Sequence, residues 1–170
     1  MARVSRPEQR PQSRIVLPTD ATSARFKAAS TPQKKQFTPR SCKRPTQHGP
    51  HSTDAPLSDI ADLVLRVNAG AYCVEAANVR HEIDWKVWRD RKLPDGKILV
   101  PGVVSHSTNL LETPELVSDR LVQYANVVGR ENVIAGTDCG LGGRVHEQIA
   151  WAKLRTLVEG AELATSRLWG

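Results

Sequence analysis

Three short apolar segments, spaced about 30 residues apart, constrain the fold of this chain more than any other feature. They start near residues 71, 98 and 132, and a helical pattern follows each one. Apolar strands that alternate with helices are typical of parallel sheets, because the helices cover the faces of the sheet. The pattern therefore predicts an α/β fold with parallel strands over 71–75, 98–104 and 133–136.

Helix signals frame these strands. Thr113, Pro114 and Glu115 combine a capping residue, a proline at the first helical position and an acid in the first turn. Gly129 is a typical stop for the same helix. By the same reasoning the sequence predicts a first helix from Leu57 that ends before Gly70, a polar helix over 84–91, and a last helix from about Val145.

Strand-helix units of this length are typical of a (β/α)8 barrel, which needs about 250 residues. The chain has 170 residues, and only three clear strands are visible in it. From spacing alone we expect either a small open α/β sheet or the C-terminal part of a barrel.

The first 50 residues differ from the rest in charge and composition. They carry eleven Lys and Arg against two acidic residues, whereas residues 51–170 carry thirteen against sixteen. Seven of the eleven prolines are here, and there is no Trp or Tyr. Such a segment buries too little apolar surface to offset the entropy of ordering its backbone. We expect a disordered basic segment over 1–48 and the folded domain over 49–170.

Composition also bears on the setting and the partners. No apolar run reaches the about 18 residues of a membrane-spanning helix, so we expect no membrane association. Three widely spaced cysteines argue against a disulfide framework and favour a reduced, cytoplasmic setting. Only the basic segment carries the charge that nucleic acid requires. A solvated tail is the simpler interpretation, so we do not expect a nucleic-acid partner.

A polar side chain follows each predicted strand. Glu75 closes the first strand, His106 lies just after the second, and Cys139 follows the third. The carboxyl ends of parallel strands meet at one edge of a sheet, so a carboxylate, an imidazole and a thiol should converge there. These groups are ligands of zinc, or the parts of a thiol nucleophile with its base.

Each of these residues also has a simpler interpretation. Glu75 could cap the next helix. His106 could be a solvated residue of a Ser/Thr-rich loop, and Cys139 a small buried apolar side chain. The glycines at 140–143 follow a strand as phosphate-binding loops do, but the Lys-Ser/Thr of a P-loop is missing, so they predict no nucleotide site.

Several segments together resemble the cobalamin-independent methionine synthase II family, which includes zinc methyltransferases and epoxyalkane:coenzyme M transferases. The resemblance covers residues 49–169 and is carried by Val74–Glu82, Lys92–Lys97, Glu131–Gly140, Ile149–Leu154 and Leu157–Ala161. It implies that residues 49–170 are the C-terminal part of a TIM (β/α)8 barrel, namely its last three βα units.

The resemblance also implies a chemistry. In the family, zinc activates a small-molecule thiol such as homocysteine to accept a methyl group from a 5-methyltetrahydrofolate-type donor. Zinc lowers the pKa of a bound thiol, and the thiolate is the nucleophile. Cys139 matches the family's last zinc cysteine and Glu75 its acidic zinc ligand. His106 lies in the loop where methionine synthases carry a histidine proposed to handle a proton, which makes it the catalytic candidate.

One part of the family pattern is missing. The other two zinc ligands form a His-x-Cys motif shortly before Gly-Pro-His, and Gly49-Pro50-His51 is present. Counting back, the expected His falls on Ser41 and the expected Cys near Lys43, so Cys42 is one position off and is not assigned as a ligand. We therefore expect an incomplete zinc ligand set in a truncated member of the family, with replaced or out-of-frame sequence over 1–48. The alternatives are an inactive remnant and a nucleic-acid binder that uses its basic tail.

Overall fold

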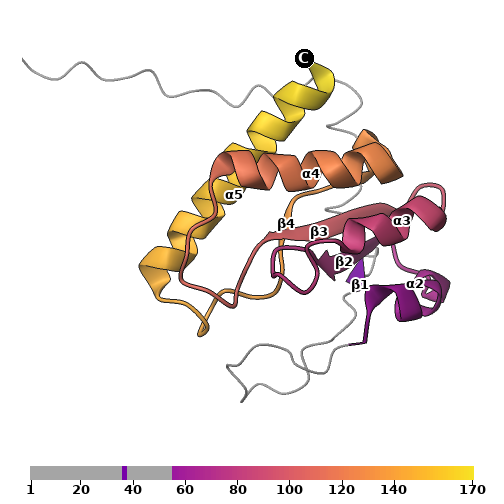
Figure 1. The fold of residues 1–170 in the computed structure, drawn as a ribbon, viewed down its shortest axis with the longest axis horizontal. Helices are drawn as coiled ribbons and strands as arrows, with labels where there is room; N and C mark the ends of the chain where they lie inside the picture. The colour runs from indigo at the N-terminus through magenta and orange to yellow at the C-terminus, as the bar shows by residue number, and fades with distance from the viewer. Residues whose placement is uncertain (1–35, 38–54) are drawn as a thin grey trace, which may run out of the picture. The chain divides into compact units, whose positions relative to one another are not determined.

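The structure is a computed structural model that describes residues 36–37 and 55–170, all within one compact unit, Lys34–Gly170. Four parallel strands form its sheet in the order β1 (Gln36–Phe37), β2 (Ala71–Glu75), β3 (Ile98–Val104) and β4 (Gly136–Thr137) (Figure 1). The predicted α/β fold with parallel strands is confirmed.

Most of the basic segment lies outside the described residues, and so do its boundary at residue 48 and Cys42. Its disorder therefore stays a prediction except at Gln36 and Phe37, which form a strand. Within this segment, the backbone of Gln36 and Phe37 pairs with Ala71 and Tyr72 of β2 as a short parallel strand that the sequence analysis did not anticipate.

The two main strand pairings differ in regularity. β2 and β3 pair without interruption from Ala71–Ile98 to Glu75–Gly102. β3 and β4 share only two pairs, with a register shift between them. The strand predicted over 133–136 is wrong in detail: Val133 forms an isolated bridge, and β4 comprises only Gly136 and Thr137. The run over 133–136 is half-buried, and its pairing with β3 is limited to the Val133–Leu99 bridge and the Gly136–Gly102 pair, with the register shift directly after Gly136.

The helices begin and end close to their predicted limits. They are α2 (Leu57–Arg66), α4 (Pro114–Val128) and α5 (Glu147–Trp169). Thr113 caps α4 by accepting a hydrogen bond from the Leu116 amide at 3.3 Å, and Gly129 follows its end with φ 92°. The helix predicted over 84–91 is divided into a 3-10 turn, η1 (Asp84–Lys86), and α3 (Val87–Asp90). A second 3-10 turn, η2 (Arg130–Asn132), precedes β4.

Two apolar clusters hold these elements together. The first packs α2 and α3 against β2 and β3, and its buried members include Val64, Tyr72, Trp88 and Leu99. The second packs α4 and α5 against the carboxyl half of β3, where Val103, Val104, Val117, Leu121 and Ala164 are buried. In Figure 1, α4 and α5 lie next to each other beside β3. In this part of the chain, no helix is long and apolar enough to cross a membrane.

Candidate functional site

The carboxyl end of β3 carries a glycine where its two neighbouring strands come closest. Gly102 pairs with Glu75 of β2 on one side and with Gly136 of β4 on the other. A Cβ atom at Gly102 would lie 2.5 Å from the backbone nitrogen of Asp138 and would also touch its Cα. The absence of a side chain here therefore allows the segment after β4 to cross over β3 towards β2.

Asp138 uses this space to bond to the segment that follows β2. Its Oδ1 atom accepts hydrogen bonds from the backbone amides of Ala76 and Ala77, both at 2.9 Å. Its own amide donates to the carbonyl of Val104 at 3.0 Å. The structure thus brings together the chain segment just after Glu75 and the one just before Cys139. The convergence of the Glu75, His106 and Cys139 side chains stays a prediction.

The surroundings of Asp138 favour its protonated form. Burial raises the pKa of this carboxyl to about 6, the charge of Glu75 adds to the rise, and the two amide donors and Arg120 oppose it. The side chain is 6% exposed, and its Oδ2 atom is buried without a hydrogen-bond partner. Asp138 was not among the predicted site residues, although its position at a strand end, directly before Cys139, was an available signal.

Glu75 lies in a small polar cluster of its own loop. One carboxylate oxygen accepts a hydrogen bond from the side-chain amide nitrogen of Asn78 at 2.9 Å and lies 3.9 Å from His81 Nε2. His81 Nδ1 in turn is 2.8 Å from an oxygen of Asp84. The next helical element, η1, begins at Asp84 and has no side-chain cap bond, so the interpretation of Glu75 as its cap is wrong.

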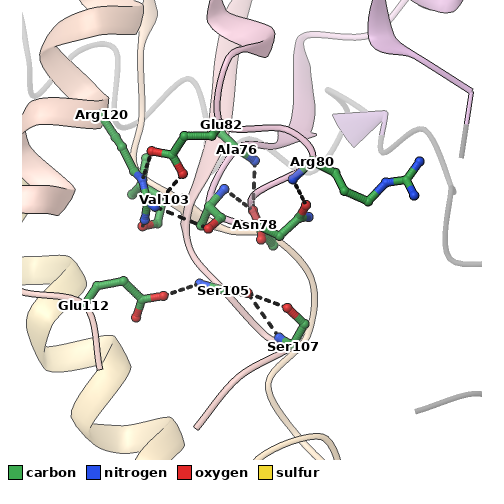
Figure 2. Close-up of polar contacts among 11 residues, drawn as sticks. Ala76, Asn78, Arg80, Glu82, Val103, Ser105, Ser107, Glu112 and Arg120 are labelled. Carbon is green, nitrogen blue, oxygen red and sulfur yellow. Dashed lines mark hydrogen bonds and ion pairs between the residues drawn. The ribbon is translucent and has the colours of Figure 1, made fainter. Parts of the chain in front are cut away.

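Arg120 anchors the other side of this loop. Its guanidinium donates to both carboxylate oxygens of Glu82, at 2.7 and 3.2 Å, and to the carbonyls of Val103 and Ala77, at 3.0 and 3.3 Å. Figure 2 shows Arg120 reaching from α4 to Glu82 and Val103. Because Ala77 is bonded to Asp138 through its amide and to Arg120 through its carbonyl, the loop after Glu75 is held from both sides.

His106 is only 3% exposed, so its interpretation as a solvated loop residue is wrong. The hydroxyls of its neighbours Ser105 and Ser107 lie 2.8 Å apart, and the Ser105 amide donates to Glu112 at 2.8 Å (Figure 2). The other Glu112 oxygen pairs at 2.8 Å with Lys153 of α5. These bonds hold the loop after β3 against α5.

Lys153 is the least expected member of this network. A lysine is rarely fully buried unless it is paired, and Lys153 is 0% exposed. Its ammonium group also donates to the carbonyl of Leu110 at 2.5 Å. In the sequence, Lys153 stands in the amphipathic pattern of the last helix, and no local signal distinguishes it from a surface lysine.

The described residues do not complete a zinc site. Glu75 and Cys139 offer a carboxylate and a half-buried thiol, two of the ligand types that zinc takes. In residues 55–170, however, no group of three or more His, Cys, Asp or Glu side chains is placed to hold a metal ion. Any complete tetrahedral site needs ligands from beyond these residues.

Comparison with known proteins identifies relatives of this chain. The family described as "Cobalamin-independent synthase, Catalytic domain" matches residues 11–163, a longer range than the resemblance over 49–169. The expectation of replaced or out-of-frame sequence over 1–48 is therefore wrong for residues 11–48. The chain is 30% identical over 82 residues to 2-hydroxypropyl-CoM lyase of Xanthobacter autotrophicus (strain ATCC BAA-1158 / Py2). That alignment covers 48% of this chain and 22% of the lyase.

A solved structure shows the same relationship. The chain is similar to a B12-independent methionine synthase from Shewanella sp. W3-18-1, determined in complex with selenomethionine, with a TM-score of 0.54 and 25% sequence identity. The match covers 62% of this chain and 29% of that protein, so the chain spans less than a third of either relative. With its parallel sheet and with most of its length matched, the chain belongs to the cobalamin-independent synthase catalytic-domain family.

Proposed function

We propose that this chain carries part of a zinc-dependent methyl-transfer site. The transfer would run from a 5-methyltetrahydrofolate-type donor to a small-molecule thiol such as homocysteine. The observation that carries the proposal is the pair of hydrogen bonds that the backbone amides of Ala76 and Ala77 donate to Asp138, because it joins the segments of Glu75 and Cys139 at one edge of the sheet. In TIM barrels the active site lies at this edge.

The relatives support the same chemistry. One is named as a methionine synthase bound to selenomethionine and the other as a lyase of a CoM adduct, so both names concern sulfur compounds. We propose that β2, β3 and β4 with their helices correspond to three βα units of the family's TIM barrel. Homocysteine is the first thiol to test, and coenzyme M is the second because of the lyase. A reduced, cytoplasmic setting suits a thiol substrate.

Three residues carry the proposed roles. Cys139 and Glu75 are two of the zinc-ligand positions, and the remaining ligands would come from outside the described residues. His106 would hold or transfer a proton at its imidazole. Its burial and the anchoring of its loop through Glu112 and Lys153 support this role, because a proton-transfer group must be held in a fixed orientation.

The first experiment is the zinc content of the purified full-length chain, measured by elemental mass spectrometry. We expect zinc to bind, and Cys139→Ser and Glu75→Gln to weaken its binding by about tenfold or more. Cys73→Ser is the matched control, because Cys73 is a half-buried thiol in β2. A chain without zinc, or a Cys139→Ser variant that keeps it fully, contradicts the ligand assignment.

The second experiment is a methyl-transfer assay with homocysteine and with coenzyme M, with the products identified by mass spectrometry. His106→Asn should lower the rate by about a hundredfold without changing the zinc content. A zinc-free chain that shows no transfer to either thiol would favour the alternative of an inactive remnant.

A further inference from the structure

We infer that Asp138 is a positioning residue that holds Glu75 and Cys139 in a fixed relation to each other. The inference rests on the proposed function, because it gives these two residues their importance. Its geometric part, the connection between the two chain segments, stands on the described contacts alone.

The strand order leaves β2 and β4 without a direct backbone connection. β2 and β4 are not neighbours in the sheet, because β3 lies between them. Backbone pairing therefore aligns β2 and β4 with each other only through β3. The Asp138 side chain connects the end of β4 directly to the end of β2 through its hydrogen bonds with Ala76 and Ala77. It passes over β3 at Gly102, where a Cβ atom would collide with Asp138.

The backbone ladder between β3 and β4 is short. β3 and β4 share two residue pairs interrupted by a register shift, so the ladder alone holds the end of β4 loosely. Asp138 adds three hydrogen bonds at this point: two received from Ala76 and Ala77, and one donated to Val104. Because Asp138 directly precedes Cys139 and Ala76 directly follows Glu75, these bonds limit how far the two backbones can move apart.

The carboxylate at position 138 is a costly side chain for a purely structural role. A buried polar atom without a partner costs free energy, and the Oδ2 atom of Asp138 is such an atom. An asparagine would place an amide oxygen at the same two donors without burying a carboxylate. A local cost in stability of this kind is typical of functional sites.

The test uses the full-length chain with Asp138→Asn, which keeps an acceptor oxygen, and Asp138→Leu, which has a similar shape and no acceptor. The first measurement is hydrogen exchange of the Ala76 and Ala77 amides by NMR. In Asp138→Leu both amides should exchange about tenfold faster or more, whereas Asp138→Asn should stay within about threefold of the wild type. Asp119→Ala is the control, because Asp119 is an exposed carboxylate on α4.

The second measurement is the alkylation rate of Cys139 by iodoacetamide, with Cys73 as the internal reference. Asp138→Leu should change the ratio of the two rates about fivefold or more relative to the wild type, and Asp138→Asn should keep the wild-type ratio. General loosening of the fold would instead raise both rates together. The alkylation is run after zinc has been removed with a chelator, because a zinc-bound Cys139 thiolate would react at a different rate. Neither measurement then depends on zinc or on activity, so a failure of the proposed function leaves their outcome unaffected.

Two results would overturn the inference. One is exchange of the wild-type Ala76 and Ala77 amides at the rate of an unstructured peptide, which can be measured even if Asp138→Leu does not fold. The other is a folded Asp138→Leu variant whose amide exchange and Cys139-to-Cys73 ratio match those of the wild type.

Discussion

The two ends of the β2–β3–β4 sheet both pack on apolar clusters, but the carboxyl end is also held by buried polar bonds. At the amino end, β2 and β3 pair in continuous register over an apolar cluster that includes Tyr72 and Leu99. At the carboxyl end, Asp138, Arg120 and the Glu112–Lys153 pair make directed polar bonds between segments far apart in the chain.

The difference separates stability from placement. Apolar burial is roughly proportional to area and has little directional preference, so many side chains of similar size can supply it. Buried polar groups require specific partners at specific distances, and the loss of one partner leaves the other unsatisfied. Apolar burial in both clusters therefore stabilises the fold, and the polar bonds at the carboxyl end provide the fixed positions that a site needs.

The largest effect is expected from breaking the buried ion pair at the carboxyl end. Lys153→Met leaves the Glu112 carboxylate buried without its cation, and we expect a loss of about 3–5 kcal/mol in the free energy of unfolding. Urea denaturation measures this loss. Arg167→Met, which breaks the exposed Arg167–Asp119 pair, is the control and should cost about 1 kcal/mol or less. Equal losses in the two variants would contradict the contrast between buried and exposed pairs.

A nearly equal effect is expected at the amino end. Leu99→Ala removes a fully buried side chain from the first apolar cluster and should cost about 3 kcal/mol in urea denaturation. Leu63→Ala on α2 is the matched control, because Leu63 is 59% exposed, and it should cost about 0.5 kcal/mol or less. If Leu99→Ala behaves like the control, the apolar cluster does not hold this end.

Filling the crossing point should have a slightly smaller effect. In Gly102→Ala the new methyl group collides with backbone atoms of Asp138, which cannot rotate away, so we expect a loss of about 2–3 kcal/mol. Gly140→Ala is the control, because nothing lies within 4 Å of a Cβ atom there. Thermal unfolding of both variants provides the comparison. An unaffected Gly102→Ala variant would show that the crossing tolerates a side chain.

The smallest effect is a dependence of stability on pH. The pKa of Asp138 is raised from 3.8 to about 6, so between these values the folded chain binds a proton more tightly than the unfolded chain. Stability contributed by this group is therefore lost as pH rises through this range, by about 2 kcal/mol. Asp138→Asn removes the titration. Its free energy of unfolding relative to the wild type should increase from about pH 4 to about pH 7, as measured in urea. A constant difference would contradict the raised pKa.

The sequence predicted the regular parts of the fold well. The limits of β2 and β3 match the predicted strands, and α4 begins after Thr113 and ends before Gly129 as its caps indicate. The errors lie where local pattern and pairing disagree: the apolar run over 133–136 pairs with β3 only at Val133 and Gly136, and β1 is too short to leave a periodic signal.

The candidate site was predicted only in part. Glu75 and Cys139 were expected at one edge of the sheet, and their segments do meet there. The roles of these residues and of His106 stay predictions. The residues that hold the edge together, Asp138 and Arg120, were not selected, because their partners lie tens of residues away and an isolated acid or arginine carries no local sign of burial.

The sequence alone determined the class of fold, since the alternation of apolar strands with capped helices at about 30-residue intervals requires a parallel sheet covered by helices. The tertiary structure decided which polar groups meet. Asp138 and Ala76 are 62 positions apart, and their bond exists because Gly102 leaves room for it. Periodicity records which face of an element is buried, whereas a directed hydrogen bond depends on where two distant segments come to lie in space.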